Sequence, residues 1–141
     1  MSLGPYHGGV GKYAKVREAT GWGIPGAADT SRTATEVDEL VCLTRHADPK
    51  VRRVAVVNLC PCHARANFPA AWDRVLEMTS DPEPLVRRAV VHMLADGSPR
   101  ERQDQVIEAI TALRNDPDRT VRRQVRLVLD NYRRRGRVNV L

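Results

Sequence analysis

The densest group of reactive side chains in the sequence is Cys60-Pro61-Cys62-His63, and Cys42 and His46 lie four residues apart upstream. Thiolates and imidazoles are ligands that Zn²⁺ takes, usually four in a tetrahedron. On a helical hairpin, however, His46 would lie beside the turn, with Cys60 roughly 13 Å away at 1.5 Å per residue. The Cys-Pro-Cys-His cluster alone supplies at most three ligands. We therefore interpret these cysteines as structural and predict no metal site and no cofactor.

Catalytic motifs are also incomplete in this sequence. The glycine-rich piece Gly8-Gly9-Val10-Gly11-Lys12 resembles a phosphate-binding loop only in part, because Tyr6 and Tyr13 stand where the loop needs its first Gly and its final Ser or Thr. No order of Ser, His and Asp, or of Cys and His, indicates a nucleophilic triad. The sequence therefore predicts no catalytic residue and a protein that is not an enzyme.

A second group of side chains suited to binding is basic and regularly spaced. Cations recur every 35 residues, at Arg53, Arg88 and Arg123. Residues four apart share one side of a helix, which places an apolar strip beside these cations: Val57, His92 and Leu127. We predict that this side contacts an acidic partner, although a solvated row of arginines is the alternative. The candidate partner-binding residues are Arg53, Arg88, His92, Arg123, Arg126, Arg133 and Arg134.

The positive charge is concentrated at the C-terminal end of the chain. The formal net charge is +6, and residues 116–141 carry eight Arg against three Asp. The run Arg133-Arg134-Arg135-Gly136-Arg137 could bind nucleic acid, since clustered basic residues are the footprint of such proteins. Arginines in the last turn of a helix are also favourable for the helix itself, so both interpretations stay open.

The elements that position these residues form a repeat. Val51-Arg52-Arg53 returns 35 residues later as Val86-Arg87-Arg88 and again as Val121-Arg122-Arg123. A fixed period in this range indicates a stacked repeat array. Each period contains a helical pattern, a short proline-bearing turn and a second helical pattern, so the unit is a helical hairpin. The predicted units are 35–66, 67–98 and 99–135, followed by a basic tail at 136–141.

The array predicts a shared core and a covered end. One hairpin cannot bury its apolar stripe alone, so neighbouring hairpins stack. The predicted core includes Leu59, Leu94 and Leu129, which are one period apart. Residues 1–34 are rich in glycine and irregular, and we predict that they pack on the array. Their apolar side chains are Tyr6, Val10, Tyr13, Val16, Trp22 and Ile24.

One unit has the residues of a known family. Leu40-x2-Leu43, Asp48-Pro49, Val51-Arg52, Ala55 and Leu59 resemble a HEAT repeat, closest to the short bacterial variety called PBS-lyase-like. The resemblance covers about residues 35–135. It implies an all-α fold, a short right-handed α-solenoid of three helical hairpins with an irregular N-terminal segment.

The resemblance also implies structural roles for six residues. In that family the Asp of the turn and the Arg after the Val typically form a pair. Carried over, this implies a ladder of Arg52, Arg87 and Arg122 with the carboxylates Asp48, Glu83 and Asp118.

The function expected from these observations is a non-catalytic binding module, an adaptor for a protein partner with an acidic surface. Nucleic-acid binding through the arginine stripe and the basic tail is the alternative. A HEAT-like enzyme of the glycosylase or lyase type is a lesser one, because no residue set marks either activity. Three cysteines without a visible leader, and no apolar run of membrane-spanning length, predict a cytoplasmic protein.

Overall fold

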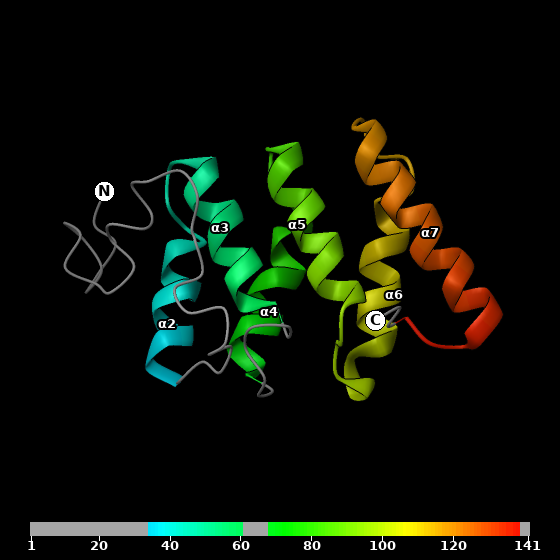
Figure 1. Ribbon diagram of the computed structural model, residues 1–141, viewed down its shortest axis with the longest axis horizontal. Coiled ribbons are helices and arrows are strands. Elements are labelled where there is room, and N and C mark those ends of the chain that lie inside the picture. Colours follow the sequence, from blue (N-terminus) through cyan, green and yellow to red (C-terminus); the bar gives the residue numbers. More distant parts are fainter. Residues whose placement is uncertain (1–33, 61–67, 139–141) are drawn as a thin grey trace, which may run out of the picture.

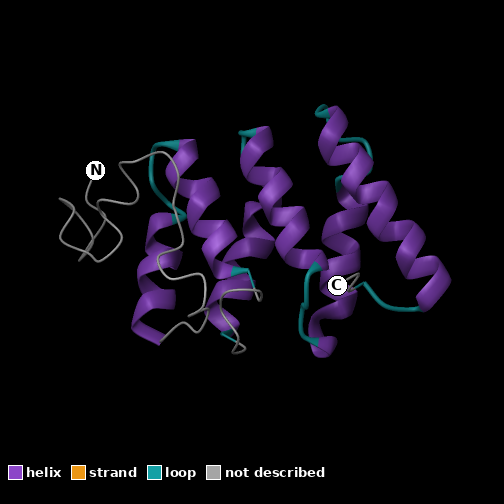
Figure 2. Cartoon of the chain, viewed as in Figure 1, coloured by secondary structure: helices purple, strands orange, loops and turns teal. Residues whose placement is uncertain are grey.

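The computed structural model describes residues 34–60 and 68–138, and this part of the chain consists of helices and turns (Figure 2). The first hairpin is α2 (Ala34–Leu43) and α3 (Pro49–Leu59). The second is α4 (Pro69–Glu77), extended by the short 3-10 helix η2 (Met78–Ser80), and α5 (Pro84–Ala95). The third is η3 (Arg100–Arg102), α6 (Gln103–Ala112) and α7 (Arg119–Arg135).

The three hairpins stand side by side in sequence order (Figure 1). Their second helices form one layer, in which α5 packs between α3 and α7, and α2 packs against α4 in the other. This arrangement confirms the predicted all-α solenoid of HEAT-like hairpins. None of the described helices combines the length and the apolar character that a membrane span requires.

Proline and acidic residues set where the second helices begin. Pro49 and Pro84 occupy the first helical position of α3 and α5, where a missing N–H costs no hydrogen bond. The carboxylates of Asp48 and Asp118 cap α3 and α7 by accepting backbone N–H groups. Gly136 ends α7 in the left-handed region, with φ of 69°, a conformation that glycine adopts without strain.

The core follows the 35-residue period. Positions one period apart are buried together, as in Leu40, Val75 and Ile110, and in Val51, Val86 and Val121. Leu59 and Leu94 are buried as predicted. Leu129 is only partly buried, because no further hairpin of the described chain stacks on its outer side. The prediction of a core residue there was therefore only partly right.

The start of the basic C-terminal segment belongs to the fold. After Gly136 the chain turns back, and Val138 is fully buried. Its backbone N–H donates to Gln103 Oε1 at 3.3 Å. The backbone carbonyl of Arg137 accepts a hydrogen bond from the Asn131 side-chain amide at 3.4 Å. The N-terminal segment predicted to cover the array lies outside the described residues, as do Cys62 and His63.

Candidate functional site

An arginine ladder joins each hairpin to the next one. The Arg52 guanidinium donates two hydrogen bonds to the carboxylate of Asp81, at 2.9 and 3.1 Å. The Arg87 guanidinium does the same to Asp116, at 2.8 and 2.9 Å. Each arginine also donates to a backbone carbonyl six residues before it, His46 or Asp81. The ladder thus ties the turn of one unit to the turn of the following unit.

The carboxylates of this ladder differ from those that the sequence predicted. Asp48 accepts the Lys50 N–H and Asp118 accepts the Val121 N–H, so these side chains cap helices of their own units. Glu83 makes no such cap and no ladder pair among the described residues. The ladder acids lie two positions earlier and one unit further on, where they face the arginine of the preceding hairpin.

Arg122 shows why the pairs run between units. Its guanidinium donates to the backbone carbonyls of Asp116 and Pro117, at 2.7 and 2.9 Å. Within residues 34–60 and 68–138 it has no carboxylate partner. The acid would come from the turn of a following unit, and α7 is the last helix described.

The ladder pairs are charged and structural. Burial would raise the pKa of Asp116, but hydrogen bonds from Arg87 and from the Asp118 N–H outweigh burial and hold that pKa below its ordinary value. The same bond raises the pKa of Arg87 further. The two side chains are only 10% and 4% exposed, so this pair is not accessible to a partner.

Arg88, predicted to bind a partner, is also engaged within the chain. Its guanidinium donates two hydrogen bonds to the Asp118 carboxylate, at 2.9 and 2.8 Å. Hydrogen bonds from Arg88 and from the Val121 N–H lower the pKa of Asp118 to about 2. The Arg88 guanidinium is therefore held in an ion pair between α5 and the start of α7, and it is not an unpaired cation for a partner.

Arg53 lies in a shallow groove between α3 and α5, which we call the α3–α5 groove. One depression of about 320 Å³ is lined by Pro49, Lys50, Arg53, Glu83 and Leu85. A second of about 380 Å³ is lined by Arg53, Val57, Leu85, Arg88, Ala89 and His92. Leu85 is 46% exposed in its centre. The groove thus combines exposed apolar surface with cations.

The same surface continues onto α7. Arg123 and Arg126 are exposed. Leu127, the residue after Arg126, is 62% exposed. Among the described residues, no carboxylate forms an ion pair with Arg53, Arg123 or Arg126. We call the α3–α5 groove together with these three α7 residues the α3–α5–α7 face. This face contains the predicted row of Arg53, Arg88 and Arg123, and the charge of Arg88 in its middle is neutralised by Asp118.

Of the remaining predicted residues, Arg133 lines a separate depression between α6 and α7, together with Arg126. Arg133 forms an ion pair with Asp130, and Arg134 is exposed. His92 lies at the end of the groove, with Nε2 at 3.6 Å from Asp96 Oδ2. The same Asp96 oxygen accepts the Cys60 thiol at 2.9 Å. This grouping was not predicted, because Cys60 lies 32 and 36 residues before His92 and Asp96 and meets them only when units stack.

The acids Asp81, Asp96 and Asp116 were therefore missed, although one signal was available. Asp81 and Asp116 are 35 residues apart, the period of the repeat. Each accepts the N–H two residues later, at 3.0 and 2.8 Å. The 35-residue period identifies Asp81 and Asp116 as equivalent, but the arginine that each one pairs with in the preceding unit follows only from the fold.

Stacked helical hairpins with an inter-unit ladder define an α-solenoid repeat protein. Residues 37–130 match the family HEAT repeats, so the chain belongs to the HEAT-repeat family. HEAT repeats are helical modules that commonly mediate protein interactions. No curated protein and no solved structure matches the chain.

Proposed function

We propose that this HEAT-repeat chain is a non-catalytic adaptor whose α3–α5–α7 face binds an acidic segment of a partner protein. The observation that carries the proposal is the pairing of exposed leucines with unpaired arginines on one layer of helices. Leu85 and Leu127 are 46% and 62% exposed, while Arg53 and Arg123 lie beside them in equivalent positions of the first and third units.

The distribution of charge along the face favours a segment with spaced acidic groups. Arg53, Arg88 and Arg123 occupy the same position of consecutive units, but Asp118 already neutralises Arg88. A partner would therefore meet unpaired cations at both ends of the face and a neutral middle. Carboxylates suit the outer positions, because a guanidinium can bind a carboxylate with two parallel hydrogen bonds. Glu83 in the groove opposes a uniformly acidic occupant.

The apolar part of the face favours a protein over a nucleic acid. Burying exposed leucine surface is worth about 25 cal/mol per Å², and a phosphate backbone offers little apolar surface in return. Single-stranded nucleic acids are bound largely by stacking on exposed aromatic rings. Of the described aromatic residues, Trp72 is buried and Phe68 and Tyr132 are partly buried. The basic end of α7 keeps nucleic acid as an outcome to be tested.

A selection from a random peptide display library tests the proposal on the full chain. We expect the bound peptides to be enriched in acidic residues flanking apolar ones. Binding should be weakened in the Arg53→Glu and Arg123→Glu variants and in Leu85→Ala. It should be kept with Arg100→Glu, a matched reversal of an exposed arginine that lies in η3, away from this face.

A parallel titration with a nucleic-acid duplex tests the alternative, nucleic-acid binding. Phosphate contacts make log affinity fall steeply and linearly with log salt, whereas a peptide held by a few carboxylates and by apolar contacts should show a shallower slope. Selection of peptides without acidic residues, or duplex binding that is tighter than peptide binding and depends on Arg134 and Arg135, would overturn the proposal.

A further inference from the structure

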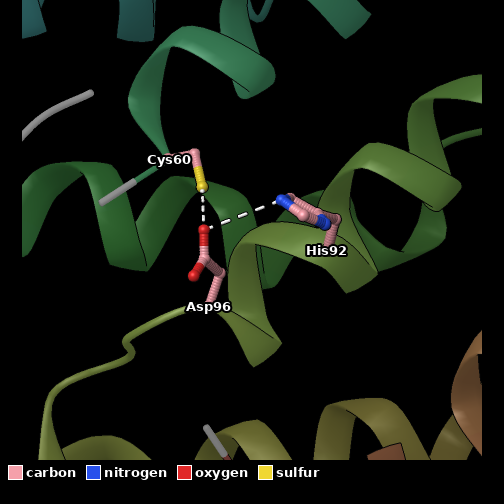
Figure 3. Close-up of side chains that lie close together, drawn as sticks. All are labelled: Cys60, His92 and Asp96. Carbon is pink, nitrogen blue, oxygen red and sulfur yellow. Dashed lines mark hydrogen bonds and ion pairs between the residues drawn. The ribbon is translucent and has the colours of Figure 1, made fainter. Parts of the chain in front are cut away.

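Three side chains that a transition metal could bind meet at the end of the α3–α5 groove (Figure 3). Cys60 follows the last residue of α3, while His92 and Asp96 come from the last turn of α5 and the residue after it. One ligand atom from each lies within 4.8 Å of the other two. Cys60 is buried, Asp96 is half-buried and His92 is exposed, so the group opens to solvent on its histidine side.

The packing of the repeat does not require these three residues. The second interface of the array, between α5 and α7, has the same construction one period later. There the positions of Cys60, His92 and Asp96 are held by Ala95, Leu127 and Asn131. Ala95 and Asn131 are buried, so at these three positions the second interface packs with no thiol, imidazole or carboxylate. All three departures from the repeat occur in one interface and converge on one point.

The geometry does not fit nucleophilic catalysis. In a catalytic Cys–His–Asp group the imidazole lies between the thiol and the carboxylate, and takes the thiol proton. Here the carboxylate lies in the middle. Asp96 Oδ2 is 2.9 Å from Cys60 Sγ and 3.6 Å from His92 Nε2. His92 thus cannot act as the base for Cys60 while Asp96 orients it.

We propose that Cys60, His92 and Asp96 form a zinc-class metal site that joins the first two hairpins. A thiolate, an imidazole and a carboxylate are all ligands of Zn²⁺, at about 2.0–2.3 Å, and three protein ligands leave one position of the tetrahedron open. Such distances put two ligand atoms about 3.3–3.8 Å apart. The present Sγ–Oδ2 distance of 2.9 Å needs to open slightly, which loss of the shared proton would favour.

Binding balances charge and protons at this place. The Cys60 thiol gives its proton to solvent, neutral His92 binds through one nitrogen, and Asp96 binds as the carboxylate. Two negative ligands then neutralise the two charges of the ion in a half-buried position. Arg88, one helical turn before His92, is itself neutralised by Asp118 and leaves little net repulsion against a cation. His92 also lines the α3–α5 groove, so the site borders that groove.

Titration of the full chain with Co²⁺, a coloured substitute for Zn²⁺, tests the site directly. We expect one ion per chain, with a thiolate-to-cobalt charge-transfer band and the intense visible bands of four-coordinate cobalt. Zn²⁺ should displace Co²⁺ and so remove the colour. It should also raise the melting temperature, because an ion that binds only the folded chain stabilises it.

Two substitutions place the residues of the third unit into the site. His92→Leu and Asp96→Asn restore what Leu127 and Asn131 are one period later, so both should fold. Loss of even an outer partner of a metal ligand typically lowers affinity about 10–100-fold, and each variant should lose at least that much. Cys42→Ser, which alters the other described cysteine, should bind as the wild type does.

Several results would overturn the site. Wild-type affinity in folded His92→Leu and Asp96→Asn, with loss only in Cys60→Ser, would show that Cys60 binds the ion with other groups. Cobalt binding without a thiolate band would remove Cys60 from the site. A melting temperature that Zn²⁺ raises equally in wild type and His92→Leu would do the same for the imidazole. Peptide binding on the α3–α5–α7 face is measured separately, so failure of either proposal is recognised on its own.

Discussion

At the scale of single residues, Arg52 and Arg87 are each bonded to two units at once. Arg87 donates to the Asp81 carbonyl of its own turn and to the Asp116 carboxylate of the next. Removing one member of a buried pair leaves the other charged and without compensation, whereas replacing both by apolar groups can be neutral or better. The ladder therefore fixes how neighbouring hairpins sit, more than it adds net stability.

Arg87→Ala should lower the free energy of unfolding by about 3–5 kcal/mol, because Asp116 is left buried and charged. Arg122→Ala should cost clearly less, since that arginine bonds only to carbonyls. The double variant Arg87→Met/Asp116→Leu should recover much of the loss. Urea unfolding measures all three. Equal losses for Arg87→Ala and Arg122→Ala would show that the inter-unit carboxylate contributes nothing.

The Arg88–Asp118 pair makes a prediction in pH. The pKa of Asp118 is lowered from 3.8 to about 2 in the folded chain. An acid with a depressed folded pKa stabilises fully above its unfolded pKa and loses that contribution as pH falls through the folded value. The melting temperatures of wild type and Asp118→Asn should thus differ near neutral pH and converge between pH 3.8 and 2. Asparagine still caps a helix, so the cap is kept; a gap that stays constant with pH would contradict the assignment.

The sequence predicted the ladder arginines but not their partners, for a physical reason. The period identifies Arg52, Arg87 and Arg122 as equivalent without any structure. A carboxylate partner depends on how far one hairpin is displaced against the next, and no local spacing contains that displacement. For the same reason, the sequence did not show that Cys60 contacts Asp96 or that Arg88 pairs with Asp118 instead of offering a cation to a partner.

At the scale of elements, helix positions follow from local chemistry. Prolines at the first positions of α3, α4 and α5 and Gly136 after α7 are readable in the sequence and mark the observed ends. How deeply a helix is buried depends on neighbours. Leu94 and Leu129 are equivalent by period, yet Leu94 is fully buried between units and Leu129 is not.

This difference predicts unequal costs for the same substitution. Leu94→Ala should lower the free energy of unfolding by about 2–5 kcal/mol, as full burial requires. Leu129→Ala should cost well under that, because its side chain already reaches solvent. Thermal or urea unfolding gives both values. If the two losses were equal, a further surface would have to cover α7.

At the scale of the whole molecule, the array places the unpaired Arg53 and Arg123 and the exposed Leu85 and Leu127 on one layer of helices. A repeat protein is held by contacts between neighbouring units, which leaves the outward side of the second helices available for binding. Exposed leucines there contribute little to folding, since surface substitutions usually change stability by less than about 0.5 kcal/mol.

Leu85→Ala and Leu127→Ala should therefore leave the melting temperature nearly unchanged while weakening the binding of a selected acidic peptide. A melting curve and a calorimetric titration on the same samples separate the two effects. A large fall in melting temperature for either variant would mean that these leucines are packed within the fold, and the face would lose its apolar component.

A charge swap between the chain and a selected peptide tests the binding face most directly. Each acidic residue of the peptide is changed to lysine in turn, and every peptide is titrated against wild type, Arg53→Glu and Arg100→Glu. We expect Arg53→Glu to weaken the parent peptide by about tenfold, which corresponds to about 1.4 kcal/mol, and one lysine peptide to regain affinity for that variant alone. Arg53→Glu that binds every peptide as Arg100→Glu does, with no lysine peptide rescued, would contradict the account.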